Sequence, residues 1–273
     1  MDNLIFLKLG GSLITDKNQP RTPRLDVLDS LCHQIADVRA RDPNLLLLIG
    51  HGAGSFGHVA AKKYATREGL SPSSLDGNKS KYWLGFSEVW HEANALNKIV
   101  MDAFRAANIP AMAISPSSSV IARDGEVSAW DTSSIKYALS KGIMPIVYGD
   151  VVFDEVRGGT ILSTEDLFMH LAREMRPQRI LLAGLEDGIY ADFPARKHRV
   201  ESVTPASYQK IRVSIGASGG TDVTGGMQSK VQQMLALVES IPELSVQIFS
   251  GEDEGSLEDA LSGKNLGTII KAN

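Results

Sequence analysis

The chain has very little cysteine, no excess of positive charge and no long hydrophobic run, and each shortage excludes a class of protein. Cys32 is the only cysteine in 273 residues, so no intrachain disulfide can form, which fits a reducing cytoplasm. Lys and Arg number 28 against 32 for Asp and Glu, and the net charge of -4 argues against nucleic acid or an anionic membrane as a partner. No stretch approaches the ~20 apolar residues that cross a bilayer.

What the chain does have is an alternation of short apolar runs with longer amphipathic ones. Strands are expected at 4–9, 45–49, 111–114, 144–148, 179–183 and 246–249, and helices at 25–38, 82–107, 132–140, 164–175 and 226–240. This order is typical of an α/β fold, a three-layer αβα sandwich with a mainly parallel central sheet. We expect one domain over 1–273, whose two lobes share a single sheet. Hairpins are expected at 124–125 and near 158–159, and a loop over a site at 71–81.

Three glycine-rich stretches follow strands or open helices: 8–12, 51–58 and 216–230. Glycine lets backbone N–H groups approach an anion, and a helix N-terminus adds a positive dipole. Three such stretches favour an extended polyanion, although each alone could simply make a tight turn. Gly52, Gly54 and Gly57 match G-x-G-x-x-G, but no second strand with a terminal acid follows, so a dinucleotide fold is not indicated. No P-loop pattern is present.

Lysines accompany these glycines. Lys8 interrupts an apolar strand, and Lys17 and Lys230 follow the first and third stretches. Phosphoryl transfer needs such cations, because charge must be neutralised on the phosphates and on the transferred group. Lys17 could also be a solvated loop residue. His58 could hold a phosphate oxygen as imidazolium, and Asp166, at a helix start, either caps that helix or pairs with Lys8 and Lys230.

These motifs resemble a known group of enzymes. KLGGSLITDK at the N-terminus, HGAGSFGH after the second strand, YGDVV at 148–152 and DVTGGMQSK before the last long helix are similar to the amino acid kinase superfamily, and within it to the isopentenyl phosphate kinase family. The resemblance implies the amino acid kinase fold and transfer of phosphate from ATP to isopentenyl phosphate, with Mg²⁺ held mainly by phosphates and water. It also implies a homodimer. No metal-ligating residues are assigned.

The resemblance also implies residue roles. Residues expected to bind the nucleotide are Lys8, Leu9, Gly10, Gly11, Ser12, Gly54, Asp187, Gly188, Gly225, Gly226 and Lys230. Residues expected to hold the acceptor phosphate are Ala53, Gly54, His58 and Gly149. The catalytic set is expected to be Lys8, Lys17, His58, Asp166 and Lys230, with Asp166 organising the lysines. The lobe of about 1–155 would take the acceptor, and that of about 156–273 the nucleotide.

Two points stay open at this stage. Tyr82, Trp83 and Phe86 share one face of a predicted helix, and either close the pocket for the isopentenyl tail or pack as core. Leu185 stands where relatives commonly carry an acidic residue, which puts one nucleotide contact in doubt. Alternative functions are a kinase of the same fold acting on another phosphate or a phosphonate such as fosfomycin, and a non-catalytic nucleotide-binding protein.

Overall fold

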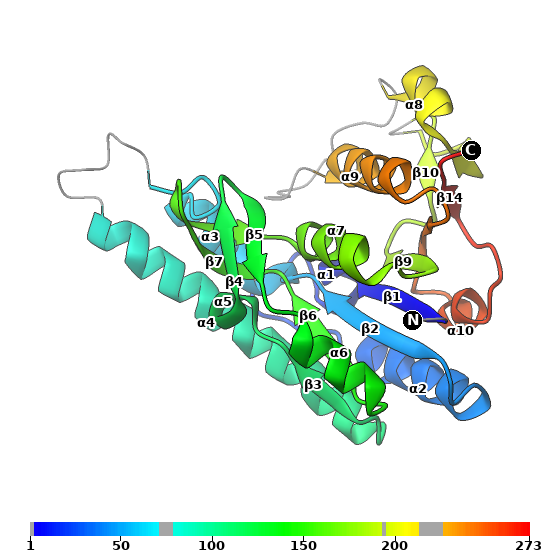
Figure 1. The fold of residues 1–273 in the computed structure, drawn as a ribbon, viewed down its shortest axis with the longest axis horizontal. Coiled ribbons are helices and arrows are strands. Elements are labelled where there is room, and N and C mark those ends of the chain that lie inside the picture. Colours follow the sequence, from blue (N-terminus) through cyan, green and yellow to red (C-terminus); the bar gives the residue numbers. More distant parts are fainter. Residues whose placement is uncertain (1–2, 71–78, 193–194, 213–225) are drawn as a thin grey trace.

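The computed structural model describes residues 3–70, 79–192, 195–212 and 226–273, and strands and helices alternate through them (Figure 1). The strands are β1 (Leu4–Leu9), β2 (Leu46–His51), β3 (Ala111–Ala113), β4 (Val120–Arg123), β5 (Glu126–Trp130), β6 (Met144–Tyr148), β7 (Asp150–Asp154), β8 (Gly158–Leu162), β9 (Arg179–Gly184), β10 (Ile189–Tyr190), β11 (Arg199–Val200), β12 (Ser202–Val203), β13 (Ser245–Ser250) and β14 (Thr268–Ile270). The helices are α1 (Gly11–Ile14), α2 (Leu25–Arg41), α3 (Gly54–Tyr64), α4 (Lys79–Ala106), α5 (Pro116–Ser119), α6 (Ser133–Ser140), α7 (Thr164–Met175), α8 (Pro205–Ile211), α9 (Gly226–Ser240) and α10 (Ser256–Leu261).

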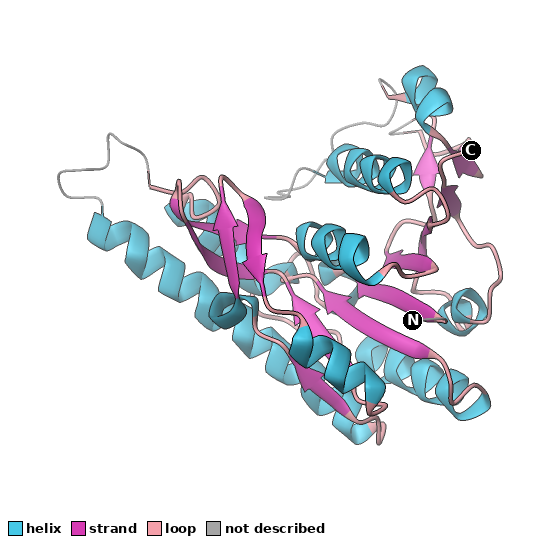
Figure 2. Ribbon diagram, in the orientation of Figure 1, coloured by secondary structure: helices cyan, strands magenta, loops and turns pink. Residues whose placement is uncertain are grey.

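A mainly parallel sheet forms the centre of the molecule, as predicted. Its eight strands lie in the order β12-β14-β13-β9-β1-β2-β6-β3. Neighbouring strands pair in parallel, except that β13 and β14 are antiparallel to each other. All six residues of β1 are buried, because helices cover both faces of the sheet and leave no side for polar residues. Strands from both halves of the chain share this one sheet (Figure 1), and its strands are drawn in magenta in Figure 2.

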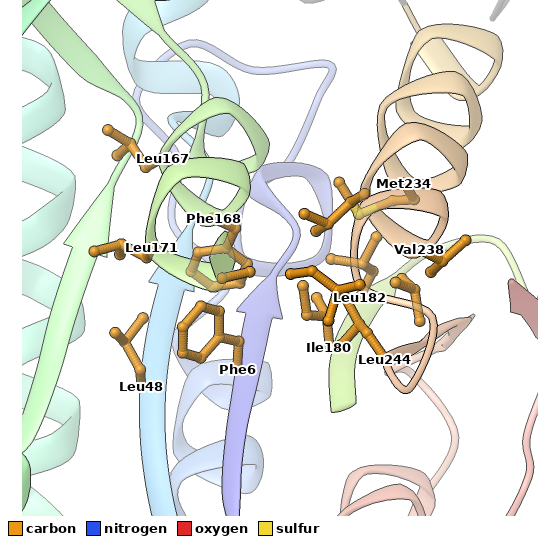
Figure 3. Close-up of a cluster of buried hydrophobic side chains, with 14 of the residues drawn as sticks. Phe6, Leu48, Leu167, Phe168, Leu171, Ile180, Leu182, Met234, Val238 and Leu244 are labelled. Atoms are coloured by element: carbon orange, nitrogen blue, oxygen red, sulfur yellow. The ribbon is translucent and has the colours of Figure 1, made fainter. Parts of the chain in front are cut away.

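Alternate side chains of β1 enter two separate cores, one on each face. Phe6 packs with α7 and α9, and its ring centroid lies 5.1 Å from that of Phe168 (Figure 3). Leu7 packs on the other face with α2, α4 and α10. The period of two along the strand therefore builds the three-layer αβα sandwich. Cys32 lies in the second core, where burial raises the pKa of its thiol to about 12, as expected for a structural cysteine.

The hairpins form a sheet of their own, which the sequence did not predict. Both predicted turns are present, and β5-β4-β7-β8 is a four-stranded sheet separate from the central one. A further two-stranded sheet joins β10 and β11. Of the predicted loop at 71–81, residues 71–78 lie outside the described residues, and Lys79–Lys81 begin α4. Among the described helices, none is long and apolar enough to cross a membrane.

Candidate active site

The site lies at the carboxyl edge of the central strands. Parallel strands end at the same edge, so the glycine-rich turns after β1 and β2 meet there, together with the segments after β6 and β9. They surround a cavity of about 1120 Å³. Of the predicted residues, those that line it are Lys8, Gly10, Gly11, Ser12, Lys17, Ala53, Gly54, His58, Gly149, Gly188, Gly226 and Lys230. The structure thus brings most of the predicted site together.

Two glycine turns touch so closely that side chains are excluded. A Cβ on Gly11 would lie 2.4 Å from the backbone nitrogen of Gly54, and Gly54 has a φ of +52°. Thr15 joins the same turns, because its Oγ1 donates to the carbonyl of Gly11 at 2.7 Å and accepts from the N–H of Ser55 at 2.9 Å. The contact fixes the N-termini of α1 and α3 side by side at the cavity. First-turn N–H groups lack partners within their own helix, so this pair is suited to bind an anion.

A buried carboxylate joins two of the predicted lysines. Glu165, on the second residue of α7, forms an ion pair with Lys8 and lies 3.7 Å from Nζ of Lys230. Burial alone would raise the pKa of Glu165, but the charges of Lys8 and Lys230 and the hydrogen bond from Lys8 lower it to about 2. Lys8 and Lys230 are therefore held together at the cavity wall as cations.

Asp166 does not make this contact, so its predicted pairing with the two lysines is wrong. Its Oδ2 accepts from the N–H and Oγ of Ser163, both at 2.7 Å, and forms the capping box of α7. Its Oδ1 accepts from Nε2 of Gln233 at 2.7 Å, and Nη2 of Arg67 lies 3.4 Å from Oδ2. The capping-box spacing S-x-x-D was visible in the sequence and assigns Asp166 to the cap. It leaves Glu165 free to point into the site.

The histidines have different surroundings. His51 is fully buried, stacks on Tyr148 with ring centroids 5.3 Å apart, and contacts Oδ1 of Asn97 at 3.2 Å, while burial lowers its pKa. It therefore supports the loop that follows β2. His58 is half-buried on α3 and lines the cavity. Gly149 also lines it, but its N–H donates to the carbonyl of His51 at 3.2 Å, so it offers room for a ligand instead of a hydrogen bond.

The predicted aromatic wall lies behind the cavity. Tyr82, Trp83 and Phe86 pack together with edge and tilted ring contacts, and none of the three is a lining residue. They pack as core against Val89, which does line the cavity, and their closing of the tail pocket stays a prediction. The apolar wall is made by residues in front of them, such as Val89 and Ile161.

Two other predicted residues, Leu9 and Asp187, are not lining residues of the cavity. The Leu9 side chain is buried in the core between sheet and helices. Asp187 accepts from the hydroxyl of Tyr190 at 2.6 Å and pairs with Arg199 at 2.9 Å, and these contacts lower its pKa even though burial opposes them. Gly225 lies outside the described residues. The part of the cavity next to the end of β9 is lined by Leu185, Glu186, Gly188, Tyr190 and Arg196.

The ionisable side chains described at the site are not arranged as the ligands of a metal ion. Within 3–70, 79–192, 195–212 and 226–273, no group of three His, Cys, Asp or Glu could hold a metal ion. The buried carboxylate of the cavity, Glu165, already pairs with lysines. The residues present therefore do not fit a protein-bound Mg²⁺, and the site offers cations and N–H groups to an anionic ligand.

Comparison with known proteins places this geometry in a family. The model of the amino acid kinase family matches residues 3–250. Isopentenyl phosphate kinase of Methanocaldococcus jannaschii is 31% identical over 271 residues, and that of Methanothermobacter thermautotrophicus is 33% identical over 270 residues, with 98% of each chain covered in both cases. A crystal structure described as isopentenyl phosphate kinase superposes with a TM-score of 0.83 at 28% identity, over 98% of this chain and 100% of that one. The chain therefore belongs to the amino acid kinase family, and within it to the isopentenyl phosphate kinases.

Proposed function

We propose that the protein transfers the γ-phosphoryl group of ATP to isopentenyl phosphate, giving ADP and isopentenyl diphosphate. The observation that carries the proposal is the pairing of Lys8 and Lys230 through Glu165, in a cavity that also receives two helix N-termini. Two phosphate-bearing anions, ATP and isopentenyl phosphate, must be brought together in this reaction, and they repel each other. Fixed cations and N–H groups reduce that repulsion and stabilise the charge of the transition state.

On the donor side, ATP phosphates lie at the turn after β1. Lys8 and the N–H groups of Gly11 and Ser12 surround them. Gly10 also lines this turn, but its N–H already donates to the carbonyl of Ala183 at 2.8 Å. The remaining nucleotide contacts proposed are Leu9, by its backbone, Asp187, Gly188, Gly225 and Gly226. Lys230 and the exposed Lys17 act on the transferred group. Mg²⁺ accompanies ATP on its phosphates.

On the acceptor side, the phosphate lies between α3 and the segment after β6. The backbone of Ala53 and the ring of His58 hold it, Gly149 leaves room for it, and Gly54 separates it from the donor. Ala61, Val89, Ala93 and Ile161 supply an apolar wall for the isopentenyl tail. In this account Glu165 replaces Asp166 as the residue that organises the lysines.

The proposed roles of the two lobes follow the division into a donor side and an acceptor side. The chain acts as one domain, with the acceptor bound by about 1–155 and the nucleotide by about 156–273, although Glu165 and Lys230 face both substrates. A cytoplasmic homodimer is proposed from the family resemblance, and sedimentation of the purified protein tests the assembly.

An acceptor panel tests the proposed function. Initial rates with ATP are measured for isopentenyl phosphate, fosfomycin, N-acetylglutamate and water. The proposal expects the highest kcat/KM with isopentenyl phosphate. A higher value for fosfomycin would favour the alternative function, a kinase that acts on a phosphonate.

Lys17→Ala is expected to lower kcat more than it weakens either substrate's binding, because charge migrates during transfer. A change confined to the KM for ATP would make Lys17 a ground-state anchor.

A further inference from the structure

Arg67 lies at the cavity with part of its guanidinium group unused. It follows α3, and its side chain is a lining residue. Nη1 is buried and has no hydrogen-bond partner among the residues that the structure describes. Leaving such a donor unsatisfied is unfavourable, more so for a charged group. A turn of the guanidinium group towards the cavity, which the partly exposed side chain lines, would bring this donor to a ligand oxygen.

The contact with Asp166 involves only Nη2 of the Arg67 guanidinium group. Nη2 lies 3.4 Å from Oδ2 of Asp166, which is longer than the roughly 2.7–2.9 Å of a strong charge-assisted hydrogen bond. Asp166 already accepts shorter bonds from Ser163 and Gln233. The carboxylate therefore orients the guanidinium group, and donor capacity remains for another anion.

A short chain of contacts connects Arg67 with the proposed position of the acceptor phosphate. A Cβ on Gly149 would lie 3.8 Å from Cα of Ser163. The N–H of Ser163 donates to Asp166 at 2.7 Å, and Asp166 contacts Arg67. Ser163 and Asp166 thus connect Gly149 with Arg67, which lies on the acceptor side of the cavity.

The backbone of Arg67 is fixed, while its side chain is accessible. Its carbonyl accepts from Oγ1 of Thr160 at 2.8 Å and from Nη1 of Arg157 at 3.4 Å, and both donors belong to the four-stranded sheet or its turn. The side chain keeps 29% of its surface exposed. A held backbone with an accessible cationic head is the arrangement that a phosphate-binding arginine requires.

We propose that Arg67 is a further phosphate-binding residue of the acceptor site. Its guanidinium group donates to oxygens of the accepting phosphate and, after transfer, to the diphosphate of the product, while Asp166 holds it in position. No covalent step is added. The inference rests on the proposed function, because it assigns the anion to the acceptor phosphate.

Kinetics of Arg67→Met and Arg67→Lys test the assignment. Arg67→Met is expected to raise the KM for isopentenyl phosphate about tenfold or more and to change the KM for ATP less than about twofold, as for loss of one charge-assisted hydrogen bond. Arg67→Lys should recover part of the loss, because it keeps the charge but not the planar group. Arg123→Met is the matched control: that arginine pairs with Glu155 and is not a lining residue.

A second readout separates this inference from the proposed function. Inorganic pyrophosphate, as a mimic of the diphosphate head, should raise the melting temperature of the wild type and Arg123→Met more than that of Arg67→Met. This difference supports the anion contact even if isopentenyl phosphate is not the acceptor, in which case only the proposed function fails. Equal pyrophosphate protection in all three proteins, or an equal rise of both KM values together with a lower melting temperature, would overturn the inference and make Arg67 structural.

Discussion

Replacing Glu165 by glutamine removes the counter-charge of two lysines and should destabilise the protein strongly when no ligand is bound. A pKa of about 2 in the folded state, against an ordinary 4.5, corresponds to roughly 3 kcal/mol of stability from the ionised carboxylate at neutral pH. Lys8, which is 9% exposed, would keep its charge in a buried position without the carboxylate of Glu165. Removing one member of a buried ion pair costs about 3–5 kcal/mol. A shift of about 2–4 °C per kcal/mol for a chain near this size predicts a melting temperature roughly 10 °C lower.

Differential scanning fluorimetry with and without ATP checks this magnitude. ATP should raise the melting temperature of Glu165→Gln more than that of the wild type, because its phosphates replace the lost carboxylate beside Lys8 and Lys230. Glu174→Gln is a suitable control on the same helix: it pairs with Lys136 near the surface and should cost at most about 1 kcal/mol.

The pH dependence of the same variant has a definite sign. Because the folded-state pKa of Glu165 is depressed, its stabilisation is fully present above about pH 4.5 and is lost as the pH falls towards 2. The difference in stability between wild type and Glu165→Gln should therefore shrink between pH 5 and pH 3. A variant that melts within about 2 °C of the wild type at pH 7, with an equal response to ATP, would refute this account of the lysine pair.

Four further predictions concern the surroundings of the site. Burial raises the pKa of Asp150 from 3.8 to about 7, so the folded protein keeps a proton that the unfolded chain releases. The free energy of unfolding therefore falls by roughly 4 kcal/mol as the pH rises from about 4 to 7. Asp150→Asn should flatten this decline, which urea unfolding at about pH 5 and pH 8 measures. Gly54→Ala should abolish activity, since its Cβ would meet Thr15 Oγ1 at 2.2 Å, whereas Gly142→Ala, with a φ of +70° but nothing within 4 Å, should keep normal turnover. His58→Ala should raise the KM for isopentenyl phosphate about tenfold or more without a matching effect on ATP, and unchanged acceptor kinetics would reject its role. Val89→Ala should improve kcat/KM for geranyl phosphate relative to isopentenyl phosphate by opening the tail wall, and an unchanged preference would place the tail elsewhere.

The fold was predictable because its main signals are local. The buried run of β1 and the spacing of Leu28, Leu31 and Ile35 in α2 specify a covered parallel sheet without reference to the rest of the chain. The separate sheet β5-β4-β7-β8 was not predictable in this way. Each of its hairpins carries a turn signal, but the parallel pairing of β4 with β7 joins segments that are distant in sequence and leave no periodic trace.

The site shows the same limit at the level of single side chains. Glycine turns and isolated lysines signal a phosphate site, and most of these residues do meet at one cavity. Which of two adjacent carboxylates faces the lysines depends on a rotation of about 100° per residue around α7. The capping box assigns Asp166 to the helix end, and this local rule, once applied, leaves Glu165 for the lysines. No such local rule points to Arg67, because its partners Arg157, Thr160 and Asp166 lie 90, 93 and 99 residues away in sequence.

Product identification with the purified chain tests the central claim most directly. Phosphorus NMR can follow ATP and isopentenyl phosphate in one tube as the reaction proceeds. The account predicts that the monophosphate signal is replaced by the coupled pair of a diphosphate monoester, with one ADP formed for each isopentenyl phosphate consumed. ATP breakdown to free phosphate without that coupled pair, or no reaction of isopentenyl phosphate while another acceptor is phosphorylated, would contradict it.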